Sequence, residues 1–159
     1  MRPECGVEQF ETLALVFLSE PEVLAAWIFG SVAQDRAHSF SDVDFAVLLG
    51  PDAPTRLDRF VFLDRLARKL GTVLGLSDQQ VDVAALNDTG VVFQHQVLRT
   101  GKLIFERDRK ACELFTWSVL RRYLDFRPTL DIFDWASGRA PRPARTAAPS
   151  LQSSSWARV

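Results

Sequence analysis

The feature that most constrains this chain is the apolar segment DVDFAVLLG at residues 42–50, which opens with two aspartates. Alternate side chains of a β-strand point to the same face of a sheet, so Asp42 and Asp44 would project together. Val43, Phe45 and Val47 would then lie on the opposite, core-facing side. The segment therefore predicts a strand that buries one face and begins with two carboxylates on the other.

Strand and helix patterns alternate around this segment. Further strands are predicted at residues 26–29, 79–86 and 102–107, and helices at residues 7–19, 55–71, 88–101 and 108–126. Within the second helix, residues at helical spacing predict the core-facing side: Leu57, Phe60, Val61, Leu66, Ala67 and Leu70. Gly71 predicts the end of this helix. Asp108 is the candidate N-cap of the last helix. The pattern predicts an α+β fold with a small β-sheet flanked by helices.

Composition divides the chain into two parts. Residues 1–134 form the predicted domain, with 15 Lys+Arg and 20 Asp+Glu, a net charge of −5. Residues 135–159 contain four arginines, no acid and no apolar period, and they predict a flexible tail rich in Ala, Arg, Pro and Ser. An acidic domain makes direct nucleic-acid binding unexpected.

The sequence also indicates where the protein works. No signal peptide and no apolar run long enough to cross a membrane is evident, which predicts a cytoplasmic protein without a membrane partner. The two cysteines, Cys5 and Cys112, are too few for a disulfide framework and are expected to be reduced thiols.

A third carboxylate and a Gly-Ser pair add to the two aspartates. Asp82 lies between apolar residues in the strand that follows, so it can join Asp42 and Asp44 across neighbouring strands. Clustered carboxylates repel one another unless a cation lies between them, and oxygen ligands suit Mg²⁺. Gly30 and Ser31 end the preceding strand, where a close backbone approach and a helix N-terminus would favour phosphate.

Each of these features has a simpler explanation when taken alone. A Gly-Ser pair is commonly a turn, an Asp-x-Asp commonly caps a strand, and a single acid commonly lies on the surface. Their joint occurrence in this order, each at the edge of a strand, favours a two-metal site for phosphoryl or nucleotidyl transfer.

The order Gly30-Ser31, ten residues, then Asp42-Val43-Asp44 resembles the signature of the DNA polymerase β-type nucleotidyltransferase superfamily. The segments SDVDFAVLL, VDVAAL and QVLRTGKLIFERD extend the resemblance, which is closest to the minimal nucleotidyltransferase (MNT) branch and covers residues 7–127. It implies a small mixed β-sheet of the polymerase β type. Gln34 and Asp35 depart from the Arg-Gly that many members carry after the serine.

The resemblance also implies the chemistry. Gly30 and Ser31 would bind the nucleotide, and Asp42, Asp44 and Asp82 would be the catalytic carboxylates and the ligands of two Mg²⁺ ions. Asp82 would also help to deprotonate the attacking hydroxyl. The reaction would transfer AMP from ATP, with pyrophosphate leaving.

The partner follows from the same resemblance. Many MNT proteins are antitoxins paired with HEPN-type RNase toxins. The expected function is therefore an antitoxin-type adenylyltransferase that modifies a hydroxyl of its toxin, expected to be that of a tyrosine. The two chains are expected to form a hetero-oligomer. Two alternatives stay open. One is a non-catalytic antitoxin that blocks its toxin sterically, and the other is a nucleotidyltransferase that acts on a small molecule or an RNA end.

Overall fold

The computed structural model describes residues 7–30 and 42–137. A four-stranded mixed sheet forms its centre, with β1 (Val23–Phe29), β2 (Val43–Leu49), β3 (Val81–Ala85) and β4 (Lys102–Glu106) in the order β3-β2-β1-β4. Strand β1 pairs antiparallel with β2 and β4, whereas β2 and β3 are parallel. The α+β class and the mixed sheet predicted from the sequence are therefore confirmed.

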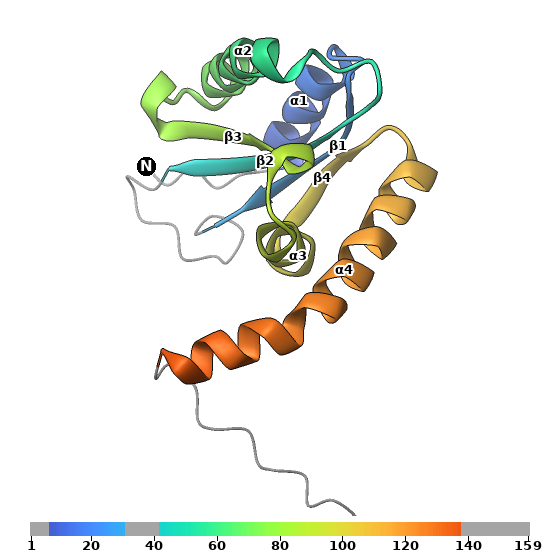
Figure 1. The fold of residues 1–159 in the computed structure, drawn as a ribbon. Coiled ribbons are helices and arrows are strands. Elements are labelled where there is room, and N and C mark those ends of the chain that lie inside the picture. Colours follow the sequence, from blue (N-terminus) through green and yellow to red (C-terminus); the bar gives the residue numbers. More distant parts are fainter. Residues whose placement is uncertain (1–6, 31–41, 138–159) are drawn as a thin grey trace, which may run out of the picture. The chain divides into compact units, whose positions relative to one another are not determined.

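Helices cover both faces of this sheet (Figure 1). Helices α1 (Val7–Leu18) and α2 (Arg56–Leu74) lie on one face, and α3 (Val91–Thr100) lies on the other. Two short 3₁₀ turns, Asp78–Gln80 and Leu86–Asp88, flank β3. The long helix α4 (Arg109–Ala136) follows β4.

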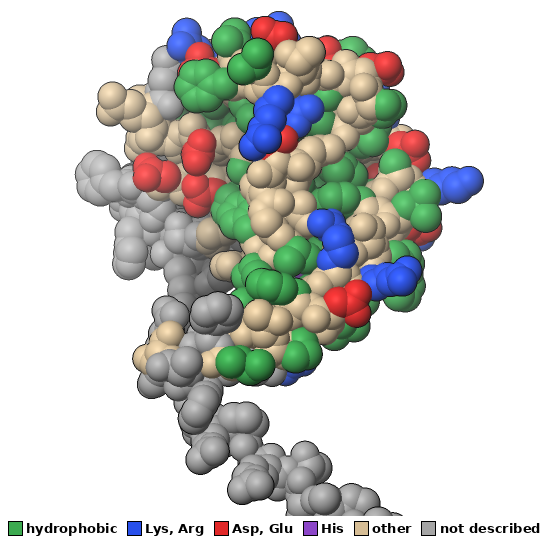
Figure 2. All heavy atoms as spheres, in the orientation of Figure 1, with side chains coloured by type: hydrophobic (Ala, Val, Ile, Leu, Met, Phe, Trp, Pro, Cys, Tyr) green, Lys and Arg blue, Asp and Glu red, His purple; other side chains and the backbone are tan. Residues whose placement is uncertain are grey.

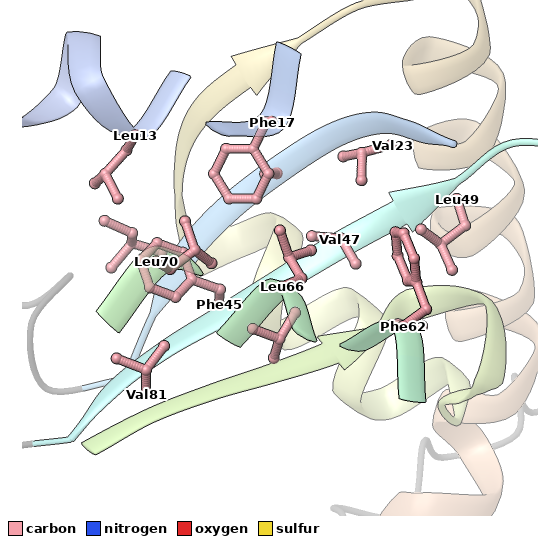
Figure 3. Packing of buried hydrophobic residues seen from close by; sticks show 14 residues of the cluster. Leu13, Phe17, Val23, Phe45, Val47, Leu49, Phe62, Leu66, Leu70 and Val81 are labelled. Carbon is pink, nitrogen blue, oxygen red and sulfur yellow. The ribbon is translucent and has the colours of Figure 1, made fainter. Parts of the chain in front are cut away.

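The larger core lies between the sheet and helices α1 and α2. Figure 3 shows Phe17 of α1, Phe45 of β2 and Leu66 of α2 packed together, all without solvent exposure. The inward-facing residues of β2 are Val43, Phe45, Val47 and Leu49, which is the alternation predicted for a half-buried strand. A smaller cluster covers the other face and includes Trp27, Ala46, Leu48, Val97 and Cys112.

The predicted core face of α2 is wrong for its first turns. Leu57, Phe60 and Val61 are 90%, 78% and 68% exposed, whereas the buried side chains are Phe62, Leu66 and Leu70. A helix buries one continuous stripe, and from Phe62 onward the stripe through Leu66 and Leu70 stays apolar to the end of the helix. The stripe that contains Leu57 and Val61 continues into charged residues.

The ends of two helices also differ from the prediction. Gly71 lies buried inside α2, and the left-handed cap is Gly75, with φ 67°. Helix α4 continues to Ala136 with Pro128 inside it, beyond the predicted end at residue 126. The predicted N-cap is confirmed, because the Ala111 amide donates to Asp108 Oδ1 at 2.9 Å.

Contacts within the chain define two compact units, Met1–Asp125 and Phe126–Val159. The predicted division into residues 1–134 and 135–159 stays a prediction, and most of the predicted tail lies outside the described residues. Among the helices that the structure describes, none has both the length and the apolar character needed to cross a bilayer.

Candidate active site

The predicted carboxylates lie at one edge of the sheet, where β2 and β3 begin. Because these strands are parallel and in register, Asp44 and Asp82 are directly paired neighbours. Both lie on the face opposite Val43, Phe45 and Val83, so their side chains share the α3 side of the sheet. Figure 2 shows acidic side chains gathered at this edge. The predicted pairing of these two acids across neighbouring strands is thus seen in the fold.

Asp44 is the most enclosed of the three acids. Its side chain is half-buried, whereas Asp42, which directly precedes β2, and Asp82 are exposed. Burial raises the pKa of the Asp44 carboxyl above its usual value, and the negative charges of Asp82 and then Asp42 raise it further. Asp82 and Asp42 are therefore close enough to Asp44 to repel its negative charge, and a cation at this edge would relieve that repulsion.

The donor chemistry fits Mg²⁺, although the three side chains do not converge on a single point. One oxygen of Asp82 accepts a hydrogen bond from the Val83 amide at 2.9 Å, on its own strand. In residues 7–30 and 42–137, no three Asp, Glu, His or Cys side chains are grouped as one metal would require. Carboxylate oxygens remain the ligand type that Mg²⁺ prefers, and it commonly keeps several waters.

Gly30 closes the site from the neighbouring strand. It follows Phe29, which pairs with Asp44 across β1 and β2, and its φ of +77° lies in the left-handed region. A Cβ atom at this position would lie 2.5 Å from Asp44 Oδ2. The strand was predicted to end here in a close approach, and the group that approaches Gly30 in the structure is the Asp44 carboxylate.

Other predicted elements of the site lie outside the described residues. These are Ser31, the departures at Gln34 and Asp35, and the helix start expected after the Gly-Ser pair. Their predicted roles stay predictions.

An aromatic pair beside the carboxylates was not anticipated. Phe29 lies opposite Asp44 and contacts Phe93 of α3 edge-on, with 5.3 Å between ring centroids. The alternation of β1 could have placed Phe29 on the carboxylate face, but no sequence pattern pairs it with Phe93. This contact holds α3 against β1, whose last residue is Phe29.

Helix α3 is also fixed to the first part of α4. The buried Gln94 side chain donates to the Leu86 and Thr89 carbonyls at 2.7 and 2.9 Å, and its oxygen accepts from Arg122 at 2.9 Å. The rings of His95 and Tyr123 stack with 3.6 Å between centroids. These side chains hold the fold together on the α3 side of the sheet.

Paired carboxylates on one face of a sheet can hold the metal ions of a phosphoryl or nucleotidyl transfer site. Residues 11–110 match the family described as "Polymerase beta, Nucleotidyltransferase". The chain belongs to this family.

A characterised relative and two solved structures are similar to the chain. It is 32% identical over 103 residues to the protein adenylyltransferase MntA of Shewanella oneidensis. These aligned residues cover 65% of this chain and 68% of that protein. A toxin–antitoxin structure with AMP-PNP contains a chain with 26% identity and a TM-score of 0.61, over 82% of this chain and 97% of that one.

The second structure is a complex of a tri-AMPylated Shewanella oneidensis HEPN toxin with an MNT antitoxin. Its matching chain is 23% identical, with a TM-score of 0.59, over 82% of this chain and 97% of that one. At this identity the likeness supports the fold alone.

Proposed function

We propose that this chain is an antitoxin-type adenylyltransferase that transfers AMP from ATP to a tyrosine hydroxyl of a HEPN-type RNase toxin and thereby silences it. The observation that carries the proposal is the direct pairing of Asp44 with Asp82 beside Gly30. The similar protein from Shewanella oneidensis is named a protein adenylyltransferase, and a similar structure is a toxin–antitoxin pair with an ATP analogue.

In this proposal Asp42, Asp44 and Asp82 would hold two Mg²⁺ ions, and Gly30 and Ser31 would bind the triphosphate of ATP. The metal would supply charge stabilisation for the α-phosphate as the bond to pyrophosphate breaks. Asp82 accepts the proton of the attacking hydroxyl, whose oxygen forms the new bond to the α-phosphorus. Pyrophosphate leaves with the electron pair of the broken bond.

The toxin supplies the hydroxyl and the orientation. A partner that docks over the carboxylate edge would place its hydroxyl in line with the α-phosphorus and would exclude water from the reaction. Transfer of AMP adds a bulky anion to the toxin, which would repel the phosphates of an RNA substrate. A modified toxin would then stay inactive after the antitoxin dissociates. A cytoplasmic hetero-oligomer of the two chains is part of the proposal.

The test is to incubate the chain with its cognate toxin, ATP and Mg²⁺, separate the two and measure the toxin's mass. Each transferred AMP unit adds about 329 Da, as a covalent modification. Asp44→Asn should lower the transfer rate by about 10³-fold or more, because a ligand and its charge are lost at the transition state.

Asp64→Asn is the matched control. Asp64 is exposed on α2 and pairs with Arg68 on the surface, so this variant should transfer AMP as the wild type does. A toxin of unchanged mass that wild type and Asp44→Asn inhibit equally well would favour steric inhibition. A modified small molecule or RNA end beside an unmodified toxin would identify a different acceptor.

A further inference from the structure

The Asp44 carboxylate lies in the space that a side chain at position 30 would fill. A Cβ atom on the Gly30 backbone would lie 2.5 Å from Asp44 Oδ2 and 3.5 Å from its Cγ. No real Cβ tolerates the first distance, so one of the two groups would have to move. The carboxylate is the end of a short side chain, whereas the Gly30 backbone directly follows Phe29, which is paired with Asp44 across β1 and β2. The carboxylate would therefore move first.

We propose that Gly30 is a positioning residue for Asp44: the missing side chain at position 30 leaves the space in which the Asp44 carboxylate must lie to bind a divalent cation. The proposal rests on the proposed function for the identity of the cation. It gives Gly30 a role beyond contact with phosphate, because the role acts through a carboxylate and exists before any nucleotide binds.

Backbone strain is the competing explanation, and the chain contains a control for it. Gly75, the cap of α2, has φ +67°, close to the +77° of Gly30, and nothing lies within 4 Å of its Cβ position. An alanine at either position would have a positive φ, which L-residues disfavour. Only the alanine at position 30 also displaces a carboxylate.

The experiment measures binding of Mn²⁺ alone, without nucleotide, from the electron paramagnetic resonance signal of the free ion. The proteins are wild type, Gly30→Ala, Asp44→Asn, the double variant and Gly75→Ala, each checked for folding by circular dichroism. Disturbing a group that orients a metal ligand commonly costs about 10–100-fold in metal affinity. We expect a loss of this size for Gly30→Ala and less than about a twofold change for Gly75→Ala, since strain alone leaves the ligand in place.

The double variant shows whether Gly30 acts through Asp44. On the Asp44→Asn background, Gly30→Ala should weaken Mn²⁺ binding no further, because the ligand that it displaces is already lost. The proposal would be overturned by a Gly30→Ala protein that binds Mn²⁺ as tightly as wild type but binds AMP-PNP more weakly, since glycine would then serve phosphate alone. Equal losses on both backgrounds would overturn it as well.

Crystal structures of metal-free wild type and Gly30→Ala provide a second readout that does not depend on metal binding or on AMP transfer. The Asp44 carboxylate should retreat from the new Cβ until the contact opens from 2.5 Å to the ordinary 3.4–4 Å. A carboxylate that keeps its place would refute the positioning role. A wild type that binds no Mn²⁺ would instead count against the metal assignment of the proposed function, and the crystal comparison would still decide the role of Gly30.

Discussion

The two faces of the sheet are built from the same strands but differ in what they bury. On the α1 and α2 side, β2 contributes Val43, Phe45, Val47 and Leu49, an apolar row along its whole length. On the α3 side, the same strand contributes Asp44 followed by Ala46 and Leu48. The first face is core from end to end, and the second is core in the middle with carboxylates at one edge.

The first face contributes most to the stability of the fold, and the second face carries the candidate active site. The first face is held by close packing around Phe17 and Phe45, whose rings lie 6.1 Å apart. The second face brings like charges together, which costs stability in the metal-free protein. Because the strands are shared, the continuous core on one side can hold the repelling carboxylates of the other in register.

The largest expected effect comes from a cavity in the first face. Phe45→Ala should lower the free energy of unfolding by about 3–5 kcal/mol, the usual cost of removing a buried phenylalanine. This corresponds to a drop of roughly 6–20 °C in the melting temperature at this chain length. Thermal unfolding followed by circular dichroism measures it.

Phe60→Ala is the matched control for the first face. Phe60 was predicted to be core but is 78% exposed on α2, so its removal should change stability by less than about 0.5 kcal/mol. If Phe60→Ala proved as destabilising as Phe45→Ala, the observed burial pattern of α2 would be contradicted.

The strands could be predicted from the sequence better than the helix faces. Apolar residues in β2 alternate with a period of two, starting beside Asp42 and Asp44. A few residues were therefore enough to predict which face of this strand points into the core. In α2, apolar residues occur on two sides of the first turns, and local spacing cannot decide which side meets the sheet. Packing along the whole helix selects Phe62, Leu66 and Leu70.

The carboxylate edge was predictable for a similar reason. Asp44 and Asp82 each interrupt an apolar strand, and parallel pairing in register brings them together. The contact between Gly30 and Asp44 was not predictable, because it depends on the antiparallel pairing of β1 with β2 and on the turn after Phe29. Sequence spacing carries no information on a distance between two strands.

The next expected effect tests whether solvent is excluded from the apolar cluster on the α3 side of the sheet. Cys112 belongs to the core of that face, and burial, then the charge of Glu106, raises the pKa of its thiol from 9.0 to about 11. The thiolate is the reactive form of cysteine. Raising the thiol pKa from 9.0 to about 11 leaves about a hundredfold less thiolate at neutral pH. Cys112 should react with Ellman's reagent about a hundredfold more slowly than an unfolded thiol.

This measurement is made in a Cys5→Ser background, so that only Cys112 contributes. The same protein unfolded in guanidinium chloride gives the reference rate, and the folded rate should rise steeply as the pH approaches 11. The unfolded thiol ionises first, so alkaline pH above about 9 should also lower stability. Rapid reaction of folded protein at pH 7 would show that this part of the face is open to solvent.

The smallest expected effect comes from relieving the charge repulsion at the carboxylate edge. The pKa of Asp44 is raised by burial and by Asp82 and Asp42, so the folded chain holds this proton more tightly than the unfolded chain does. Ionisation of Asp44 therefore costs stability, which is lost as the pH rises from the unfolded value near 3.9 through the folded pKa.

Asp44→Asn should accordingly stabilise the metal-free protein at pH 7, and the gain should fade as the pH falls toward 4. Because water reaches the site, the gain is on the order of 0.5 kcal/mol, or about 1–2 °C in melting temperature. Asp64→Asn, which removes an exposed acid paired with Arg68, should show no such gain. Differential scanning calorimetry at pH 7 and pH 4 with chelator present gives the comparison. If Asp44→Asn were destabilised at pH 7 without metal, the Asp44 carboxylate would stabilise the second face. The conclusion that its charge costs stability there would then be wrong.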